Sequence, residues 1–364
     1  MADSAPNFGV YVHVPFCSRR CDYCAFATWD DKSSRISGYM GALEAEIRRA
    51  VDAGMTPAET IFVGGGTPSL VPAEMLARVI TAVPTTPGAE VTVECNPDNV
   101  TDSLLGAYRD AGVNRISLGV QSMVPHVLAG LGREHDPDNV VAAVEAIRRV
   151  GIPTFNLDLI YGAHGETIDD WASTLRSALD LDPPHVSAYA LTVEAGTPLA
   201  DDVSRHPDDD DQADKYPLAN DAFETAGLLN YEISNWARPG HESRHNRLYW
   251  AQADYRGFGC AAHSHSSGRR WWNVRTPERY IDLVNRGEST EAAFEQLTAE
   301  QIAAERVQLT IRRREGAALA DIAPEKHAEL REMVDDGLLV VSGDAVMLTP
   351  GGRLLANAIT LRLT

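Results

Sequence analysis

The most informative part of the sequence is Tyr11-Val-His-Val-Pro-Phe-Cys17-Ser-Arg-Arg-Cys21-Asp-Tyr-Cys24, in which three closely spaced cysteines follow an apolar run. The cysteines follow the spacing C-x3-C-x2-C. Three thiolates on one tight loop can hold three irons of a [4Fe–4S] cubane and leave the fourth iron open. We therefore predict that Cys17, Cys21 and Cys24 bind such a cluster. A zinc knuckle is the alternative, although zinc sites usually add paired C-x2-C units or distant histidines.

Short apolar runs alternate with amphipathic stretches through the first half of the chain. We predict strands at 8–14, 60–63, 90–94, 115–118, 154–160 and 186–191. We predict helices between them at 34–53, 72–83, 101–111, 137–150 and 167–181. Five successive β-α units with buried-type strands indicate a parallel sheet, and right-handed crossovers roll such a sheet into a barrel or an open doubly wound sheet.

Polar and glycine residues gather where these predicted strands end. The residues concerned are Gly64-Gly-Gly-Thr-Pro-Ser69, Glu94-Cys-Asn-Pro97, Gln121-Ser122, Asn156, Asp158 and Tyr161. A (β/α) barrel builds its site at the C-terminal ends of its strands. With six clear strands, we predict an α/β fold whose core is a partial (β/α)6 barrel with a site at this end.

From about Leu297 onward the repeated β-α pattern ends and a different order of elements is expected. Helices are expected at 298–314, 324–336 and 352–359, with a hairpin formed by 338–341 and 345–348, an order that resembles a winged-helix module. We predict one domain over residues 1–296, containing the barrel and an extension, and a C-terminal helical or winged-helix-like domain over 297–364. The charged run Asp208–Asp211 is interpreted as a solvated loop.

The composition of the 364-residue chain restricts the classes of partner that it can bind. Its formal net charge is −20, which disfavours nucleic acid and anionic membranes, since both need clustered Lys and Arg. No apolar run reaches the roughly 18 residues of a transmembrane helix. Residues 1–7 lack the features of a signal peptide. We expect a cytoplasmic protein with no integral membrane segment.

Five motifs then follow one another in order. They are Tyr11–Cys17, Gly64–Ser69, Glu94–Pro97, Leu118-Gly-Val-Gln-Ser122 and Leu157-Asp-Leu-Ile-Tyr-Gly162. Together with the cysteine triplet, they resemble the radical S-adenosylmethionine superfamily, and within it the oxygen-independent coproporphyrinogen III oxidase group, over nearly the whole chain. The resemblance implies that S-adenosylmethionine binds the open iron, and that the cofactor supplies the chemistry while the protein supplies geometry.

The resemblance also implies site residues, position by position. The implied S-adenosylmethionine contacts are Tyr11, Tyr23, Gly65, Gly66, Thr67, Glu94, Gln121, Arg133 and Asp158. The three residues of the glycine segment would bring backbone close to the methionine moiety, where a Cβ would obstruct. Glycines at strand ends are also common in turns, and Asp158 alone could be a buried cap. No catalytic residue is assigned.

Three features move the resemblance away from the oxidases and towards the HemW branch of heme chaperones. The oxidases resemble C-x3-C-x2-C-x-C, whereas Phe26 stands at the fourth position here, and only seven residues precede the first strand. His245-Asn-Arg-Leu-Tyr-Trp250 matches the H-N-x-x-Y-W pattern of that branch. Imidazole is a good heme ligand, so His245 is a predicted heme contact; an ordinary hydrogen-bonded core histidine is the alternative.

The functional prediction is heme binding and transfer to an acceptor protein that the sequence does not name. Oxidative decarboxylation of coproporphyrinogen III is the rival, so enzymatic activity and the oligomeric state, including a homodimer, stay open. Cys95 is interpreted as a packing residue, and Cys260 as a small buried hydrophobe, with a soft metal ligand as the alternative for Cys260. His263 and His265 are interpreted as satisfied histidines of a glycine-rich turn, with cofactor or heme contact as the alternative.

Overall fold

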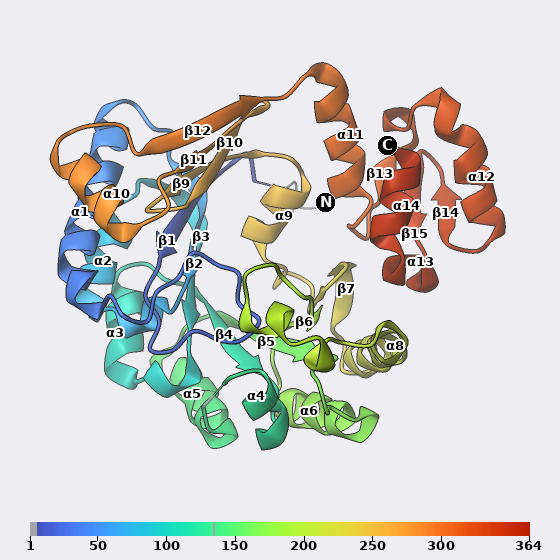
Figure 1. Cartoon of the computed structure of the whole chain (residues 1–364), viewed down its shortest axis with the longest axis horizontal. Coiled ribbons are helices and arrows are strands. Elements are labelled where there is room, and N and C mark those ends of the chain that lie inside the picture. The colour runs from blue at the N-terminus through green and yellow to red at the C-terminus, as the bar shows by residue number, and fades with distance from the viewer. Residues whose placement is uncertain (1–5, 134) are drawn as a thin grey trace.

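The computed structural model describes residues 6–133 and 135–364, which build one large sheet of twelve strands and a smaller sheet of three. Six neighbouring strands are parallel and follow chain order. They are β1 (Phe8–Val14), β2 (Ala58–Gly65), β3 (Thr85–Cys95), β4 (Arg115–Gln121), β5 (Thr154–Tyr161) and β6 (His185–Ala190). The predicted six-stranded parallel core is confirmed, and the strands form a curved sheet (Figure 1).

Helices cover the outer face of these strands (Figure 1). They are α1 (Ile36–Asp52), α2 (Ala73–Ala82), α3 (Asp102–Asp110), α4 (Pro125–Gly130), α5 (Pro137–Val150) and α6 (Ile168–Asp180). Val10, Val12 and Val14 point outward into the same apolar core as Leu43 and Ile47 of α1. Because side chains alternate along a strand, the residues between these valines point into the barrel.

Further strands extend the sheet at both edges without closing it. On the β6 side lie antiparallel β8 (Asn235–Ala237) and β7 (Leu229–Glu232). On the β1 side lie parallel β9 (Asp254–Phe258) and antiparallel β10 (His263–Ser266), β11 (Arg269–Asn273) and β12 (Glu291–Gln296). The described strands thus form the partial barrel that the sequence predicts, and α10 (Pro277–Asn285) packs against α1.

The short helix α9 (Arg244–Trp250) lies inside the barrel against β1 and β2 (Figure 1). Ser243 caps its start by accepting a hydrogen bond from the backbone N–H of Asn246. The Glu90 carboxylate, which points inward from β3, accepts hydrogen bonds from the backbone N–H groups of Arg244 and His245. A carboxylate at a helix N-terminus stabilises its unpaired N–H groups, so Glu90 holds α9 in place.

The prediction of a loop at Asp208–Asp211 is wrong. These residues begin α8 (Asp209–Thr225), which follows the short helix α7 (Pro198–Asp201). The Asp208 side chain accepts hydrogen bonds from the N–H groups of Asp210 and Asp211. Aspartate is a preferred N-cap, and acidic residues in the first turn interact favourably with the helix dipole, so the charge run is a helix start.

The C-terminal region has an apolar core of its own, which includes Val307, Ile311, Met333 and Leu363. Its elements are α11 (Ala299–Thr310), β13 (Ala317–Ala318), α12 (His327–Asp335), β14 (Leu339–Ser342), β15 (Ala345–Leu348), α13 (Pro350–Leu354) and α14 (Ala356–Leu363). The single helix expected at 352–359 is wrong, because the chain leaves helical geometry at Leu355. The boundary at residues 296 and 297 stays a prediction.

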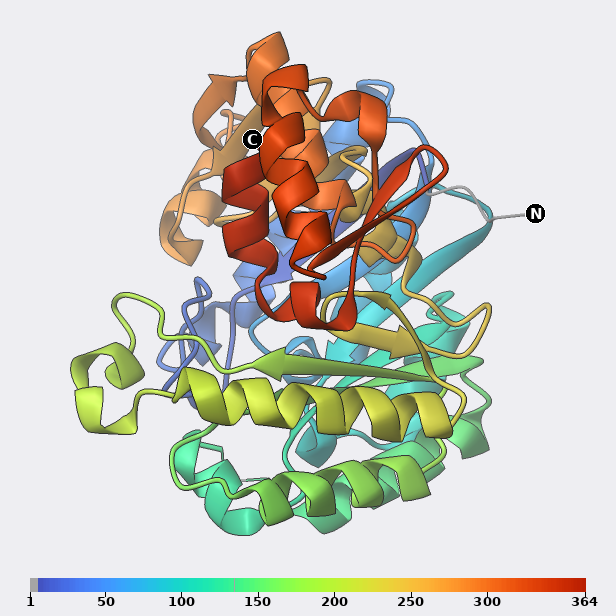
Figure 2. The same cartoon turned by 90° about the vertical axis from the view of Figure 1, so that its right-hand side faces the viewer.

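Figure 2 shows where this region lies, with the red C-terminal helices across from the yellow-green α8. Within the described part of the chain, no helix has the length and apolar character needed to span a membrane.

Candidate functional site

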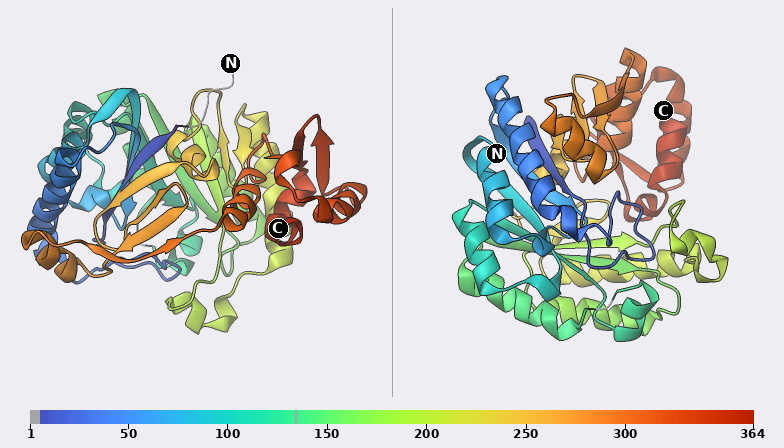
Figure 3. Two further views of the ribbon diagram at one scale, coloured as in Figure 1. Left: turned by 90° about the horizontal axis from the view of Figure 1, so that it is seen from above. Right: turned by 60° about the vertical axis from the view of Figure 1, so that its left-hand side comes forward.

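A large cavity of about 1270 Å³ opens at the C-terminal ends of the parallel strands. The parts of the chain that line it include the loop that carries the cysteines, the ends of β2 to β6, the start of α8, and the segment joining α13 to α14. Figure 3 (right) shows the blue cysteine loop and the red C-terminal helices approaching each other over this end of the barrel. The site therefore combines segments from both ends of the sequence.

The cysteine loop is fixed at its two ends by hydrogen bonds to β1 and its extension. The backbone N–H of Cys17 donates to the carbonyl of Trp29, and the N–H of Trp29 donates to the carbonyl of Pro15. His13 lies beneath the loop with Nε2 at 2.9 Å from the carbonyl oxygen of Ala27. These contacts close the loop into a compact turn, which brings its three thiols near one another.

Cys17, Cys21 and Cys24 are all half-buried, reduced and lining the cavity. Burial raises the pKa of the Cys17 thiol to about 11, although the nearby hydroxyl groups of Thr67 and Thr28 oppose the shift. Burial likewise raises the pKa of Cys24. Thiolates in such surroundings require compensating positive charge, which coordinated iron provides. The donor set therefore fits an iron–sulfur cluster.

Two buried guanidinium groups beside the thiols have an Nε atom without a hydrogen-bond partner. They belong to Arg20 and Arg133, and Nη1 of Arg133 lies 3.7 Å from Sγ of Cys21. Unpaired buried donors are rare in proteins, so both fit an occupant with acceptor atoms. Among the described residues, no three His, Cys, Asp or Glu side chains converge on a single metal ion; a cubane does not need this, since each thiolate binds a different iron.

The glycine segment is required by the packing of the protein itself. A Cβ on Gly65 would lie 2.5 Å from Cε1 of His13, and a Cβ on Gly66 would lie 2.6 Å from the carbonyl oxygen of Phe16. The N–H groups of Gly65, Gly66 and Thr67 donate to Glu94, Val14 and Phe16. They are not available to a ligand, so a backbone contact would use carbonyl oxygens, which suit an ammonium group.

Two carboxyl groups lie at the floor of the cavity. Burial, followed by the nearby charge of Asp158, raises the pKa of Glu94 to about 8, while the N–H of Gly65 opposes the shift. Burial also raises the pKa of Asp158, although Ser117 and Asn156 donate to its two oxygens. Glu94 therefore holds a proton near neutral pH and can donate a hydrogen bond to a ligand.

Gln121 and Tyr23 also line the cavity. Gln121 ends β4 with a φ of +65°, a left-handed conformation that is uncommon for residues other than glycine and tends to occur at functional sites. Tyr23 lies beside Cys21 and Arg133, and burial strongly raises the pKa of its phenol. With these two, all predicted site residues except Tyr11 and His245 line one cavity.

Tyr11 and His245 lie deeper in the barrel. The Tyr11 hydroxyl lies 3.0 Å from Nδ1 of His13. His245 is fully buried, with its ring nitrogens 2.8 Å from the Thr60 hydroxyl and 2.9 Å from the Tyr249 hydroxyl. Burial lowers its pKa to about 3. The structure thus does not bring His245 together with the cysteines, because α9 faces the interior of the barrel; heme contact would require α9 to leave it.

Cys95, Cys260 and His265 occupy packed positions, whereas His263 lies on the surface. Cys95 and Cys260 belong to the main apolar core. His265 uses Nδ1 towards the carbonyl of Ala253 and accepts a hydrogen bond on Nε2 from the N–H of Gly268. His263 is exposed.

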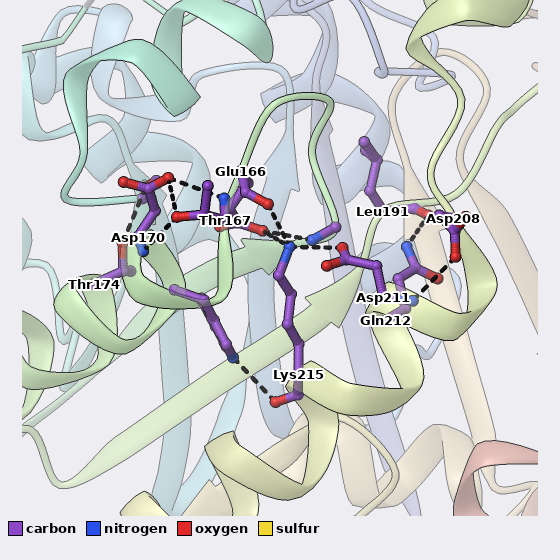
Figure 4. A network of polar contacts seen from close by, with 12 residues as sticks. Glu166, Thr167, Asp170, Thr174, Leu191, Asp208, Asp211, Gln212 and Lys215 are labelled. Carbon is purple, nitrogen blue, oxygen red and sulfur yellow. Dashed lines mark hydrogen bonds and ion pairs between the residues drawn. The ribbon is translucent and has the colours of Figure 1, made fainter.

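The α8 side of the cavity is fixed by a buried ion group that the sequence did not reveal (Figure 4). Nζ of Lys215 lies 3.1 Å from Glu166 and 2.6 Å from Asp211, and the lysine side chain has no exposure to solvent. Gln212 of the same helix donates to the carbonyl of Leu191, and both line the cavity. The group thereby ties the first turn of α8 to the loop after β5.

Sequence analysis also missed Arg312, Arg353, Leu354 and Leu355, which line the cavity from the C-terminal region. They belong to no motif, and no spacing connects them with the cysteines. Only the folded chain brings them to the site.

The chain is similar to known proteins over nearly its whole length. Residues 11–178 match the family described as the radical SAM superfamily. The chain is 41% identical to the heme chaperone HemW of Mycobacterium tuberculosis (strain CDC 1551 / Oshkosh), covering 98% of this chain and 94% of that protein. It is 34% identical to HemW of Bacillus subtilis (strain 168), and the match covers 96% of this chain and 97% of that protein.

Among solved structures, coproporphyrinogen III oxidase (HemN) from Escherichia coli, a radical SAM enzyme, superimposes with a TM-score of 0.86. The match covers 99% of this chain and 90% of that chain at 22% identity. It shows a shared fold.

Proposed function

Because this chain belongs to the HemW family of the radical SAM superfamily, we propose that it is a heme chaperone that binds heme and passes it to an acceptor protein. The single observation that carries the proposal is the similarity to HemW proteins, at 41% identity over 98% of the chain. The residue at position 26 supports it, since Phe26 takes the place of the fourth cysteine in the oxidase pattern.

We assign the cluster to Cys17, Cys21 and Cys24, and S-adenosylmethionine to the adjoining cavity floor. When bound, a [4Fe–4S] cluster supplies one-electron chemistry and an open iron for a chelating ligand. The side chains that would orient the cofactor are Tyr23, Gln121, Arg133, Glu94 and Asp158. Protonated Glu94 would donate a hydrogen bond, the Arg133 guanidinium would attract a carboxylate, and the surrounding walls would limit access of water.

A heme contact by His245 remains a separate proposal. It demands that the imidazole exchange its partners Thr60 and Tyr249 for heme, and hence that α9 move. A cytoplasmic location, the absence of nucleic acid partners and a homodimer likewise remain predictions of this proposal.

Titration of hemin into the anaerobically reconstituted protein, followed by addition of a heme-free acceptor hemoprotein, tests the function. We expect a Soret band that develops on binding and then shifts to that of the acceptor. Failure to bind hemin would overturn the proposal. Conversion of coproporphyrinogen III to protoporphyrinogen, with reductant and S-adenosylmethionine present, would assign the chain to the oxidases instead.

A further inference from the structure

One end of the cavity has no role in the assignments above. It faces the C-terminal region and is lined by Arg312, Arg353, Leu354 and Leu355, with Phe26 of the cysteine loop lining the same cavity. Phe26 is 62% exposed, Leu354 42% and Leu355 49%. Large apolar side chains left exposed within a concave site indicate a binding surface for an apolar ligand.

The two arginines of this end are held by neutral partners. Nε of Arg312 donates to the carbonyl of Gln308, and Nη2 donates to Oδ1 of Asn357 at 2.6 Å. Nη1 of Arg353 lies 3.5 Å from Oδ1 of Asn220. In the part of the chain that the structure describes, neither arginine forms an ion pair with a carboxylate. Their positive charge is therefore available to carboxylates of a ligand, which guanidinium groups bind with two parallel hydrogen bonds.

One buried acid lies near Arg312 without pairing with it. Burial lowers the pKa of Arg312 and Glu232 opposes the shift, but the Glu232 carboxylate is hydrogen bonded to the Asn235 amide. Burial raises the pKa of Glu232 to about 7, so this neighbour is only partly ionised near neutral pH.

The cavity also carries the reverse charge. Asp209 and Asp210 at the start of α8 and Glu194 line it. These acidic groups repel a ligand carboxylate, whereas the two arginines attract it. A ligand with an apolar body and acidic groups along one edge would therefore enter in a single orientation.

We propose that heme binds at this end of the cavity, with its macrocycle against Phe26, Leu354 and Leu355 and its two propionates paired with Arg312 and Arg353. The inference rests on the proposed function, since it locates the cargo within the same site. Single small-molecule sites measure roughly 300–1,000 Å³, and this cavity has about 1270 Å³. The volume accommodates heme beside a cofactor at the cysteine end.

Hemin titrations of two kinds of variant test the assignment. The double variant Arg312→Gln/Arg353→Gln removes both charges while keeping neutral hydrogen-bonding groups. We expect its hemin Kd to rise roughly a hundredfold, about tenfold for each lost charge-assisted contact. Leu355→Glu places a carboxylate on the apolar wall, and we expect a loss of at least roughly tenfold.

Matched controls come from the same region. Arg306→Gln removes a half-exposed arginine of α11 that lies 3.9 Å from Asp321, and Leu361→Glu alters a side chain of α14 that is 74% exposed. Neither residue lines the cavity. Both controls should bind hemin like the unaltered protein, and equal unfolding temperatures and cluster absorbance would show that each variant is folded.

Hemin dimethyl ester supplies a probe that needs no variant. Without free propionates, it should bind the unaltered protein as weakly as hemin binds the double arginine variant, and the double variant should bind both forms equally. Equal affinity of the unaltered protein for hemin and its ester would overturn this inference alone, as would a double variant that behaves like Arg306→Gln. Failure of the unaltered protein to bind either form would overturn the proposed function.

Discussion

His13 occupies the space that a side chain on Gly65 would need, with Cε1 at 2.5 Å from the position of a Cβ. Gly65 also has a φ of +115°. We predict that Gly65→Ala destabilises the protein by about 3 kcal/mol or more, since it combines backbone strain with overpacking. Gly54→Ala is the matched control, because Gly54 has a φ of +91° and nothing within 4 Å. Urea unfolding of both variants measures the difference, and equal losses would contradict the role of His13.

A second prediction concerns Glu94 and pH. Its folded-state pKa of about 8 lies above its ordinary value of 4.5, so between these pH values the folded chain binds a proton that the unfolded chain has lost. Stability therefore falls as the pH rises through this window, by an amount on the order of a few kcal/mol. Tyr11, Cys95, Asp158 and Tyr249 lie close enough to interact electrostatically with this carboxyl group.

Glu94→Gln should remove this pH-dependent part of the stability, since glutamine does not ionise. We expect the variant to unfold at a higher temperature than the unaltered protein near pH 9, with a much smaller difference near pH 5. Glu145→Gln, on the exposed side of α5, is the control. A Glu94→Gln variant with the same pH profile as the unaltered protein would show that the Glu94 carboxyl ionises normally.

The third prediction tests the ion group of Figure 4. Lys215→Met leaves Glu166 and Asp211 without their cation, and we expect a loss of about 3–5 kcal/mol, as for other buried pairs that lose one partner. Lys32→Met removes a surface ion pair with Glu278 and should change the stability by about 1 kcal/mol or less. Denaturant unfolding compares the two, and similar small losses would mean that the α8 anchor contributes little.

The fourth prediction separates the two interpretations of His245. His245→Ala removes a fully buried ring and leaves Thr60 and Tyr249 without a hydrogen-bond partner, so we expect a loss of about 2–4 kcal/mol. His126→Ala, at an exposed position, is the control. With α9 inside the barrel, the folded variant should keep its hemin affinity. Loss of the Soret shift at unchanged folding would show instead that α9 leaves the barrel to bind heme.

The fifth prediction concerns Phe26, which is exposed beside the cluster loop. Phe26→Ser should change the stability by about 0.5 kcal/mol or less, because little buried surface is lost. It should weaken hemin binding several-fold and leave cluster reconstitution unchanged. The iron content and the hemin titration curve, measured on one preparation, check both expectations; unchanged hemin binding would remove Phe26 from the heme site.

The order and type of the core elements were predictable from the sequence. The first strand begins and ends at Phe8 and Val14 and the fourth predicted helix at Pro137 and Val150, as expected, because apolar periodicity and N-cap residues are local signals. The acidic start of α8 was misread, since a charge run alone does not distinguish a solvated loop from a capped helix.

The parallel core, the cysteine loop and the family follow from the sequence alone, because spacing within one segment fixes which side chains a short loop presents together. The packing of the folded chain was needed to place His245 inside the barrel beside Glu90 and Thr60, and to bring Arg312 and Arg353 to the same cavity as Phe26. Those relationships join residues more than 150 positions apart. They depend on which surfaces pack together when the chain folds, and no local pattern encodes that choice.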